Sequence, residues 1–150
     1  MTSLDLIKSF LAVKEIAIAG VSRNPQKSGN AAYKGLKSAG YTLFPVNPLM
    51  DAYDNDVCWH SVIQLEGKTS ALLLVVPPDQ SLQILPEALE AGIKTIWFQP
   101  GSESPATAEF CQKHKMDYIE KQCILMFAEP MHSFHKFHRF VNKVLGKYPK

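Results

Sequence analysis

The sequence predicts an α/β fold in which helices cover both faces of a parallel β-sheet. Segments with the two-residue period of strands alternate along the chain with segments of helical period. Strands separated by helices pair in parallel through right-handed crossovers. The run ALLLVV, residues 71–76, is apolar throughout, which is typical of a strand buried on both faces of such a sheet. With 150 residues, 46% of them hydrophobic, we expect a single domain spanning 1–150.

Amphipathic segments and glycine stop signals predict the helices. Gly40 and Gly92 follow the second and third helical segments, where a glycine is expected to end a helix. Pro86 falls inside the third segment, so we expect it to kink that helix or to begin a second helical segment. Helices are expected at 3–13, 29–40, 79–92 and 104–115, with a C-terminal basic amphipathic helix at about 132–147.

Short apolar segments between these helices predict five or six strands. The third is ambiguous: we expect a short strand near Val57 and Cys58, followed by a brief helical turn. The first strand is expected to be central and the strand order to be 3-2-1-4-5, in a Rossmann-like, three-layer, doubly wound parallel sheet. The expected strands lie at 15–20, 41–46, 57–58, 70–76, 94–99 and 117–120.

In a sheet of this kind, ligands bind beyond the carboxyl ends of the strands, so the residues after each strand are the most informative. After the first strand comes GVSRNPQKSGN, in which Gly20 and Gly29 bracket the cations Arg23 and Lys27. Glycines allow close approach to the backbone, and the start of the next helix offers free N–H groups, so the loop suggests phosphate binding. A glycine-rich turn with solvated cations is the alternative.

The loop differs from the common nucleotide-binding motifs. It lacks the G-x-G-x-x-G fingerprint, because Gly20 and Gly29 are nine residues apart, and it lacks the Gly-Lys-Ser/Thr of a Walker A loop. A dinucleotide-binding domain also places an Asp or Glu at the end of the second strand for the ribose hydroxyls. Here that strand ends in FPVNP, and the first carboxylate is Asp51. These departures argue against an NAD-binding site.

Two further strand ends suggest ligand contacts. Pro77 and Pro78 follow the ALLLVV strand and leave a rigid apolar surface without N–H groups, although simple strand termination explains them equally well. Gln99 and Gly101 follow the next strand, where they are placed to approach the same crevice or to form a plain turn.

Taken together, these segments resemble a known family. AGVSRNPQKSGNAAYKGLKSAGY, FPVNP, VVPPD and GIKTIWFQPGSES, followed by Cys123, occur in an order that is similar to the single-domain coenzyme A-binding proteins of bacteria. Those proteins are similar to the CoA-binding domain of succinyl-CoA synthetases and ADP-forming acyl-CoA synthetases. The resemblance runs from about Glu15 to Cys123 and rests on several separate strand-end motifs.

The resemblance implies a CoA-binding site at these positions. It assigns the loop after the first strand to the phosphates, the end of the second strand to the adenosine, and the prolines after the ALLLVV strand to the nucleotide or the start of the pantetheine arm. Gln99 and Gly101 would approach that arm further along. The implied residues are Gly20, Val21, Ser22, Arg23, Lys27, Gly29, Asn30, Pro45, Asn47, Pro48, Val76, Pro77, Pro78, Gln99 and Gly101.

The resemblance implies binding of CoA or an acyl-CoA but no reaction. The synthetases use a phosphorylated histidine in a further domain and an ATP-grasp partner, and the five histidines of this chain lie outside the matching segments. No Ser-His-Asp, paired-carboxylate or H-E-x-x-H pattern nominates a catalytic group. We therefore expect a carrier, sensor or accessory protein. An NAD(P)-binding oxidoreductase and a protein-interaction module that uses the basic C-terminal helix are the alternatives.

The basic charge is concentrated at the C-terminus. Residues 1–131 hold 11 basic and 14 acidic residues, a net of −3, whereas 132–150 hold 5 basic and no acidic residues. This argues against a nucleic-acid surface on the body. The apolar stripe of the C-terminal segment suggests that its helix docks on the body, a second copy or a partner protein; the stripe consists of Phe134, Phe137, Val141, Val144 and Leu145. His132, His135 and His138 lie in this segment, but their three-residue spacing spreads them around a helix, so we expect no metal site.

The cysteines and the hydropathy suggest a cytoplasmic protein. Cys58, Cys111 and Cys123 are an odd number without a C-x-x-C pair, which fits a reducing compartment better than a disulfide scaffold. The N-terminal segment has charged residues within its apolar pattern, so we expect neither a signal peptide nor a membrane span.

Overall fold

The structure is a computed structural model that describes residues 3–24 and 26–128. Within these residues, five parallel strands form a sheet of order β2-β1-β5-β6-β7, and helices cover both of its faces, which confirms the predicted Rossmann-like α/β fold. The strands of the sheet are β1 Glu15–Ala19, β2 Thr42–Val46, β5 Ala71–Leu74, β6 Thr95–Phe98 and β7 Asp117–Ile119. The helices are α1 Leu4–Ala12, α2 Ser28–Ser38, α3 Pro78–Glu90 and α4 Pro105–Lys113, with short 3-10 helices η1 Val62–Leu65 and η2 Ile124–Met126.

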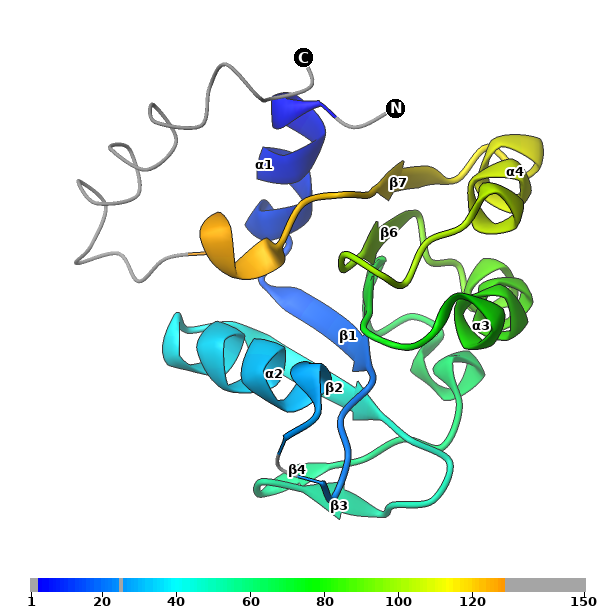
Figure 1. Ribbon diagram of the computed structural model, residues 1–150. Helices are drawn as coiled ribbons and strands as arrows, with labels where there is room; N and C mark the ends of the chain where they lie inside the picture. Colours follow the sequence, from blue (N-terminus) through cyan, green and yellow to red (C-terminus); the bar gives the residue numbers. More distant parts are fainter. Residues whose placement is uncertain (1–2, 25, 129–150) are drawn as a thin grey trace.

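Helices α1 and α2 lie on one side of the sheet and α3 and α4 on the other (Figure 1), and each face buries its own hydrophobic core. On one face, α1, α2 and η2 pack around Trp97, whose ring makes an edge contact with Phe10 at a centroid distance of 5.2 Å. On the other face, α3, α4 and η1 pack through residues that include Leu85, Cys111 and Val62. Burial on both faces explains why β5 reads as an unbroken apolar run.

Local signals place the helix ends. Ser3 caps α1 and Ser104 caps α4, each accepting a hydrogen bond from a first-turn N–H. Gly40 and Gly92 take left-handed φ angles of 98° and 81° just after α2 and α3, as the sequence predicts. Pro86 lies within α3, and the helix continues through that position to Glu90 instead of dividing into two segments.

The predicted strand order is wrong at one edge of the sheet. The buried strand β5 is the middle strand, and β1 lies beside it rather than at the centre. The expected third strand does not extend the sheet: Val57 belongs to β4 (Asp56–Val57), which pairs antiparallel with β3 (Ala52–Tyr53). Within the described residues, the β-pairing of this segment with the sheet edge is limited to a single parallel bridge between Val46 and Trp59.

A tight turn explains why this segment forms a hairpin instead of a strand. Asp54 and Asn55 both take positive φ angles, 48° and 72°, which is the backbone of the two-residue hairpin turns that Asp and Asn favour. The hairpin is then held against α2, because Asp56 bonds both Tyr33 and Lys37. The chain therefore turns back before it can pair along β2.

The predicted C-terminal helix at 132–147 lies outside the described residues. Among the helices that are described, none is both long and apolar enough to cross a membrane.

Candidate functional site

A cleft of about 630 Å³ lies at the carboxyl ends of β1, β2 and β5, where this type of sheet binds ligands. One wall is the loop after β1, a second is the segment that follows β2, and a third is the exposed side of α3. Its lining residues are Ala19, Gly20, Val21, Ser22, Lys27, Val46, Asn47, Pro48, Leu49, His60, Ser61, Val62, Val75, Val76, Pro77, Gln80, Gln83, Ile84 and Glu87.

The two glycines of the loop allow the cleft walls to approach one another. Gly20 has a φ of 129°, and a Cβ there would lie 2.3 Å from the Val75 carbonyl oxygen. A Cβ on Gly29 would lie 2.1 Å from the carbonyl oxygen of Gly20. The glycines therefore allow α2 and the end of β5 to pack against the loop. The sequence predicts instead that these glycines let a ligand approach the backbone.

Asn30 fixes the shape of the same loop from the first turn of α2. Its buried side chain accepts a hydrogen bond from the Ser22 N–H at 2.8 Å and donates to the carbonyls of Ser22 and Asn24 at 2.8 and 2.9 Å. These contacts engage both the oxygen and the nitrogen of the Asn30 amide. Asn30 therefore supports the loop and is not among the residues that line the cleft.

Lys27 brings a positive charge to the cleft at the start of α2. It is the N-cap residue of that helix, and no side chain caps the helix there. The first-turn N–H groups of an uncapped helix need partners, and together with the helix dipole they favour an anion. Lys27 is exposed and lines the cleft, so its ammonium group is placed to add to this effect.

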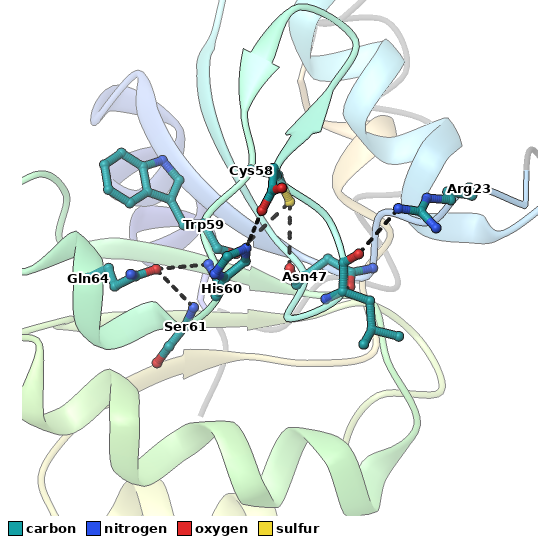
Figure 2. Close-up of polar contacts among 9 residues, drawn as sticks. Arg23, Asn47, Cys58, Trp59, His60, Ser61 and Gln64 are labelled. Carbon is teal, nitrogen blue, oxygen red and sulfur yellow. Dashed lines mark hydrogen bonds and ion pairs between the residues drawn. The ribbon is translucent and has the colours of Figure 1, made fainter.

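The segment after β2 is tied to the loop after β1 by two contacts, of which Figure 2 shows the one made by Arg23. The Asn47 side chain donates to the Val21 carbonyl at 2.9 Å and accepts from the Leu49 N–H at 2.8 Å. The Arg23 guanidinium donates to the Leu49 carbonyl at 3.3 Å. Asn47 therefore serves as a brace where a dinucleotide-binding domain has its ribose carboxylate, and Arg23 lies beside the cleft instead of among its lining residues.

Histidine and cysteine side chains follow on this segment, with different exposure. His60 lines the cleft, is exposed, and contacts the Asp51 carboxylate through Nε2 at 2.8 Å. Cys58 is buried, and burial raises the pKa of its thiol. Burial also raises the pKa of Cys111 to about 12, so both thiols are protonated at neutral pH and unreactive.

The wall formed by α3 was not predicted from the sequence. Gln80, Gln83, Ile84 and Glu87 recur at helical spacing and line the cleft. The Ser61 hydroxyl, at the start of η1, donates to Glu87 Oε1 at 2.6 Å and so joins this wall to the segment after β2. The helical spacing of these four residues shows that they share one side of α3, but only the fold shows that this side faces the cleft.

The structure brings about half of the predicted site residues together. Gly20, Val21, Ser22, Lys27, Asn47, Pro48, Val76 and Pro77 line the cleft. Gln99 lies elsewhere, because its Oε1 accepts from the Ile124 N–H at 2.7 Å and its Nε2 lies 3.5 Å from Cys123 Sγ. Gly101 forms a turn with a φ of 95°. Arg23, Gly29, Asn30, Pro45, Pro78, Gln99 and Gly101 are not among the lining residues.

The lining of the cleft is chemically mixed. It combines apolar side chains and amide groups with two serine hydroxyls, one histidine, one lysine and one carboxylate. In the part of the chain that is described, no group of three His, Cys, Asp or Glu side chains could hold a metal ion.

Comparison with known proteins identifies the family. A model of the CoA binding domain matches residues 14–129, which include every strand of the sheet and the whole lining of the cleft. The chain belongs to the CoA-binding domain family. The match confirms the resemblance drawn from the strand-end motifs.

Relatives of this CoA-binding domain include both large enzymes and small proteins. It is 32% identical over 81 residues to the ADP-forming acetate–CoA ligase of Methanocaldococcus jannaschii, and this region is 54% of the chain but 12% of the ligase. It is 24% identical over 111 residues to the uncharacterized protein YneT of Bacillus subtilis, covering 74% of the chain and 82% of YneT.

A solved structure agrees in both fold and size. A conserved hypothetical protein from Pyrococcus furiosus is 41% identical, with a TM-score of 0.72, and the match covers 74% of this chain and 96% of the other. CoA-binding domains of this kind are therefore found both as parts of long ligases and as small proteins.

Proposed function

We propose that this CoA-binding domain holds coenzyme A or an acyl-CoA in the cleft and acts as a carrier, sensor or accessory protein. The observation that carries the proposal is that Lys27, the N-cap residue at the uncapped start of α2, lines a cleft that also has apolar wall residues. A phosphate at that helix start would receive N–H groups, the helix dipole and an ammonium charge together. The family supports the choice of CoA over other phosphate-bearing ligands.

Different residues would contact different parts of the ligand. Lys27 and the Gly20–Ser22 backbone face the diphosphate, while Val76, Pro77 and Pro48 cover the apolar parts of the ligand. Asn30 and Asn47 act indirectly, because their side chains hold the loop and the segment after β2 in position.

A carrier or sensor fits the chain better than an enzyme. The matched region is 12% of the acetate–CoA ligase, so the activity of that ligase is not carried over to this chain. His60 and Asp51, the histidine–carboxylate pair nearest the cleft, are both largely exposed, and the neighbouring Cys58 thiol is buried, with a pKa that burial raises. We therefore assign no reaction to the site.

Ligand-dependent thermal unfolding tests the proposal. The protein is heated with CoA, acetyl-CoA, dephospho-CoA or NADH at matched concentrations. A ligand that binds only the folded state stabilises it by about 2.7 kcal/mol at a hundred times its Kd, so CoA and acetyl-CoA should raise Tm by several degrees. No shift with either, or a larger shift with NADH, would contradict the proposal.

A further inference from the structure

The two ends of the cleft differ in charge. The cleft follows α3 from Pro77 to Glu87, ten residues, which corresponds to about 15 Å along a helix. Pro77 lies near the phosphate-binding end, because Val75, two residues earlier, contacts Gly20. Lys27 supplies a positive charge at that end, and Glu87 supplies a negative charge at the other.

The Glu87 carboxylate is held in one orientation. Its Oε1 accepts from the Ser61 hydroxyl at 2.6 Å, and Ser61 is itself fixed as the N-cap of η1, where its oxygen accepts from the Ile63 N–H at 3.2 Å. Oε2 receives no hydrogen bond among those described. An oriented carboxylate in a cleft wall is an acceptor for a ligand N–H or O–H group, and it repels phosphate.

Apolar side chains surround this acceptor. Ile84 lies one turn before Glu87 on α3, Val62 follows Ser61 at the start of η1, and Val46 ends β2; all three line the cleft. The Gln83 amide and the His60 ring line the cleft as well. Apolar side chains around an oriented carboxylate match an uncharged, flat ring that carries an amino group on its edge. They match a phosphate poorly.

We propose that this end of the cleft is a base subsite in which Glu87 accepts a hydrogen bond from the exocyclic amino group of adenine, with Ser61 as its positioning residue. The inference rests on the proposed function, because it takes CoA to be the ligand and adds which part of the site selects its base. The phosphates then lie at the Lys27 end, and the charge difference between the ends sets the direction of the bound nucleotide.

A pair of nucleotides that differ in one group tests this directly. Adenosine 5′-monophosphate and purine riboside 5′-monophosphate differ only in the 6-amino group, and each is titrated by NMR into the full chain. The wild type should bind the adenine nucleotide roughly tenfold or more tightly, the range expected for a hydrogen bond to a charged group. The Glu87→Leu variant should bind the two nucleotides equally, and Glu87→Gln, which keeps the side-chain shape, should retain part of the preference.

Two further variants separate the inference from a loss of folding. Glu90→Leu removes an exposed carboxylate from the same helix outside the cleft and should keep the wild-type preference. Ser61→Ala should reduce the preference while it leaves the Glu87 charge in place. Thermal unfolding of each variant without ligand shows that the fold is retained.

The outcomes also distinguish this inference from the proposed function. If the wild type binds CoA but does not discriminate between the two nucleotides, or if Glu87→Leu keeps the preference, the base subsite is overturned and CoA binding stands. If CoA binds and neither nucleotide does, the base lies elsewhere and the inference is again overturned. If CoA itself fails to bind, both proposals fall.

Discussion

The two ends of the cleft are built in different ways. At the Lys27 end, which we propose as the phosphate-binding end, the contributing residues lie within 20–30 of the sequence and bond one another, as Asn30 does with Ser22 and Asn24. At the Glu87 end, Ser61 and Glu87 come from segments 26 residues apart that meet only in the fold. The first end can be recognised from a local pattern, whereas the second depends on which side of α3 faces the sheet edge.

The difference extends to what each end tolerates. The phosphate-binding end is packed backbone against backbone through Gly20 and Gly29, so it has no room for additional atoms. The Glu87 end is formed by side chains on α3 and η1, which can be exchanged without moving the backbone. Substitutions of the two glycines at the first end should therefore affect stability, and substitutions at the second end should affect ligand selection.

Gly29→Ala should have the largest effect on stability. The added Cβ would lie 2.1 Å from the Gly20 carbonyl oxygen, and a backbone neighbour cannot rotate away, so we expect a loss of about 3 kcal/mol or more. Gly35→Ala in the same helix is the control, because its Cβ would meet only the Leu125 side chain, which is exposed. Urea denaturation of both variants measures the difference; equal losses would contradict the packing role of Gly29.

Gln99→Leu should come next, with a loss of about 1–3 kcal/mol and unchanged affinity for CoA. Its Oε1 accepts from the buried Ile124 N–H, which would be left without that partner. Denaturation and calorimetry on the same variant separate the two effects. A clear loss of CoA affinity at unchanged stability would restore Gln99 to the site, as the sequence alone suggests.

Asp56 should make stability depend on pH in the acid range. Although burial raises its pKa, the hydrogen bonds from Lys37 and Tyr33 outweigh this and hold it below the usual 3.8. A lowered pKa stabilises the fold fully above the unfolded value and loses that contribution as pH falls through the folded value. We expect up to about 1 kcal/mol for this partly exposed pair. Denaturation below pH 4 should show a shallower decline for Asp56→Asn than for the wild type.

Arg23→Ala should have the smallest effect on stability, within about 0.5 kcal/mol, because its side chain is exposed and makes one contact with the Leu49 carbonyl. Since Arg23 is not among the cleft-lining residues, its loss should also weaken CoA less than the loss of Lys27 does. Calorimetry on both variants compares them, and a larger effect at Arg23 would show that its side chain turns toward the ligand.

The extent of sequence-based prediction follows the same division. The alternation of strands and helices, the buried β5 and the glycine stops at Gly40 and Gly92 could be predicted because their signals are local. The third strand could not, because the turn at Asp54 and Asn55 and the contacts of Asp56 with α2 redirect the chain. In the candidate site, Lys27 could be predicted because it is a cation in the loop that follows the first strand.

Glu87 was missed because a carboxylate on an amphipathic helix carries no signal of its own. Gln99 was placed at the site because it follows a strand, yet its side chain satisfies a backbone N–H of η2. Position after a strand therefore predicted that the loop after β1 lies at the cleft, but it could not distinguish a lining residue from a supporting one.

The most direct test of the central claim is calorimetric titration of CoA into the wild type, Lys27→Ala and Lys34→Ala. Lys34 is exposed on α2 away from the cleft lining, so its removal changes the net charge equally. We predict saturable binding by the wild type, a ten- to hundredfold loss in Lys27→Ala, and wild-type affinity in Lys34→Ala. A parallel titration with dephospho-CoA shows whether Lys27 meets the 3′-phosphate, in which case CoA loses more. No binding by the wild type, or an unchanged affinity in Lys27→Ala, would contradict the account.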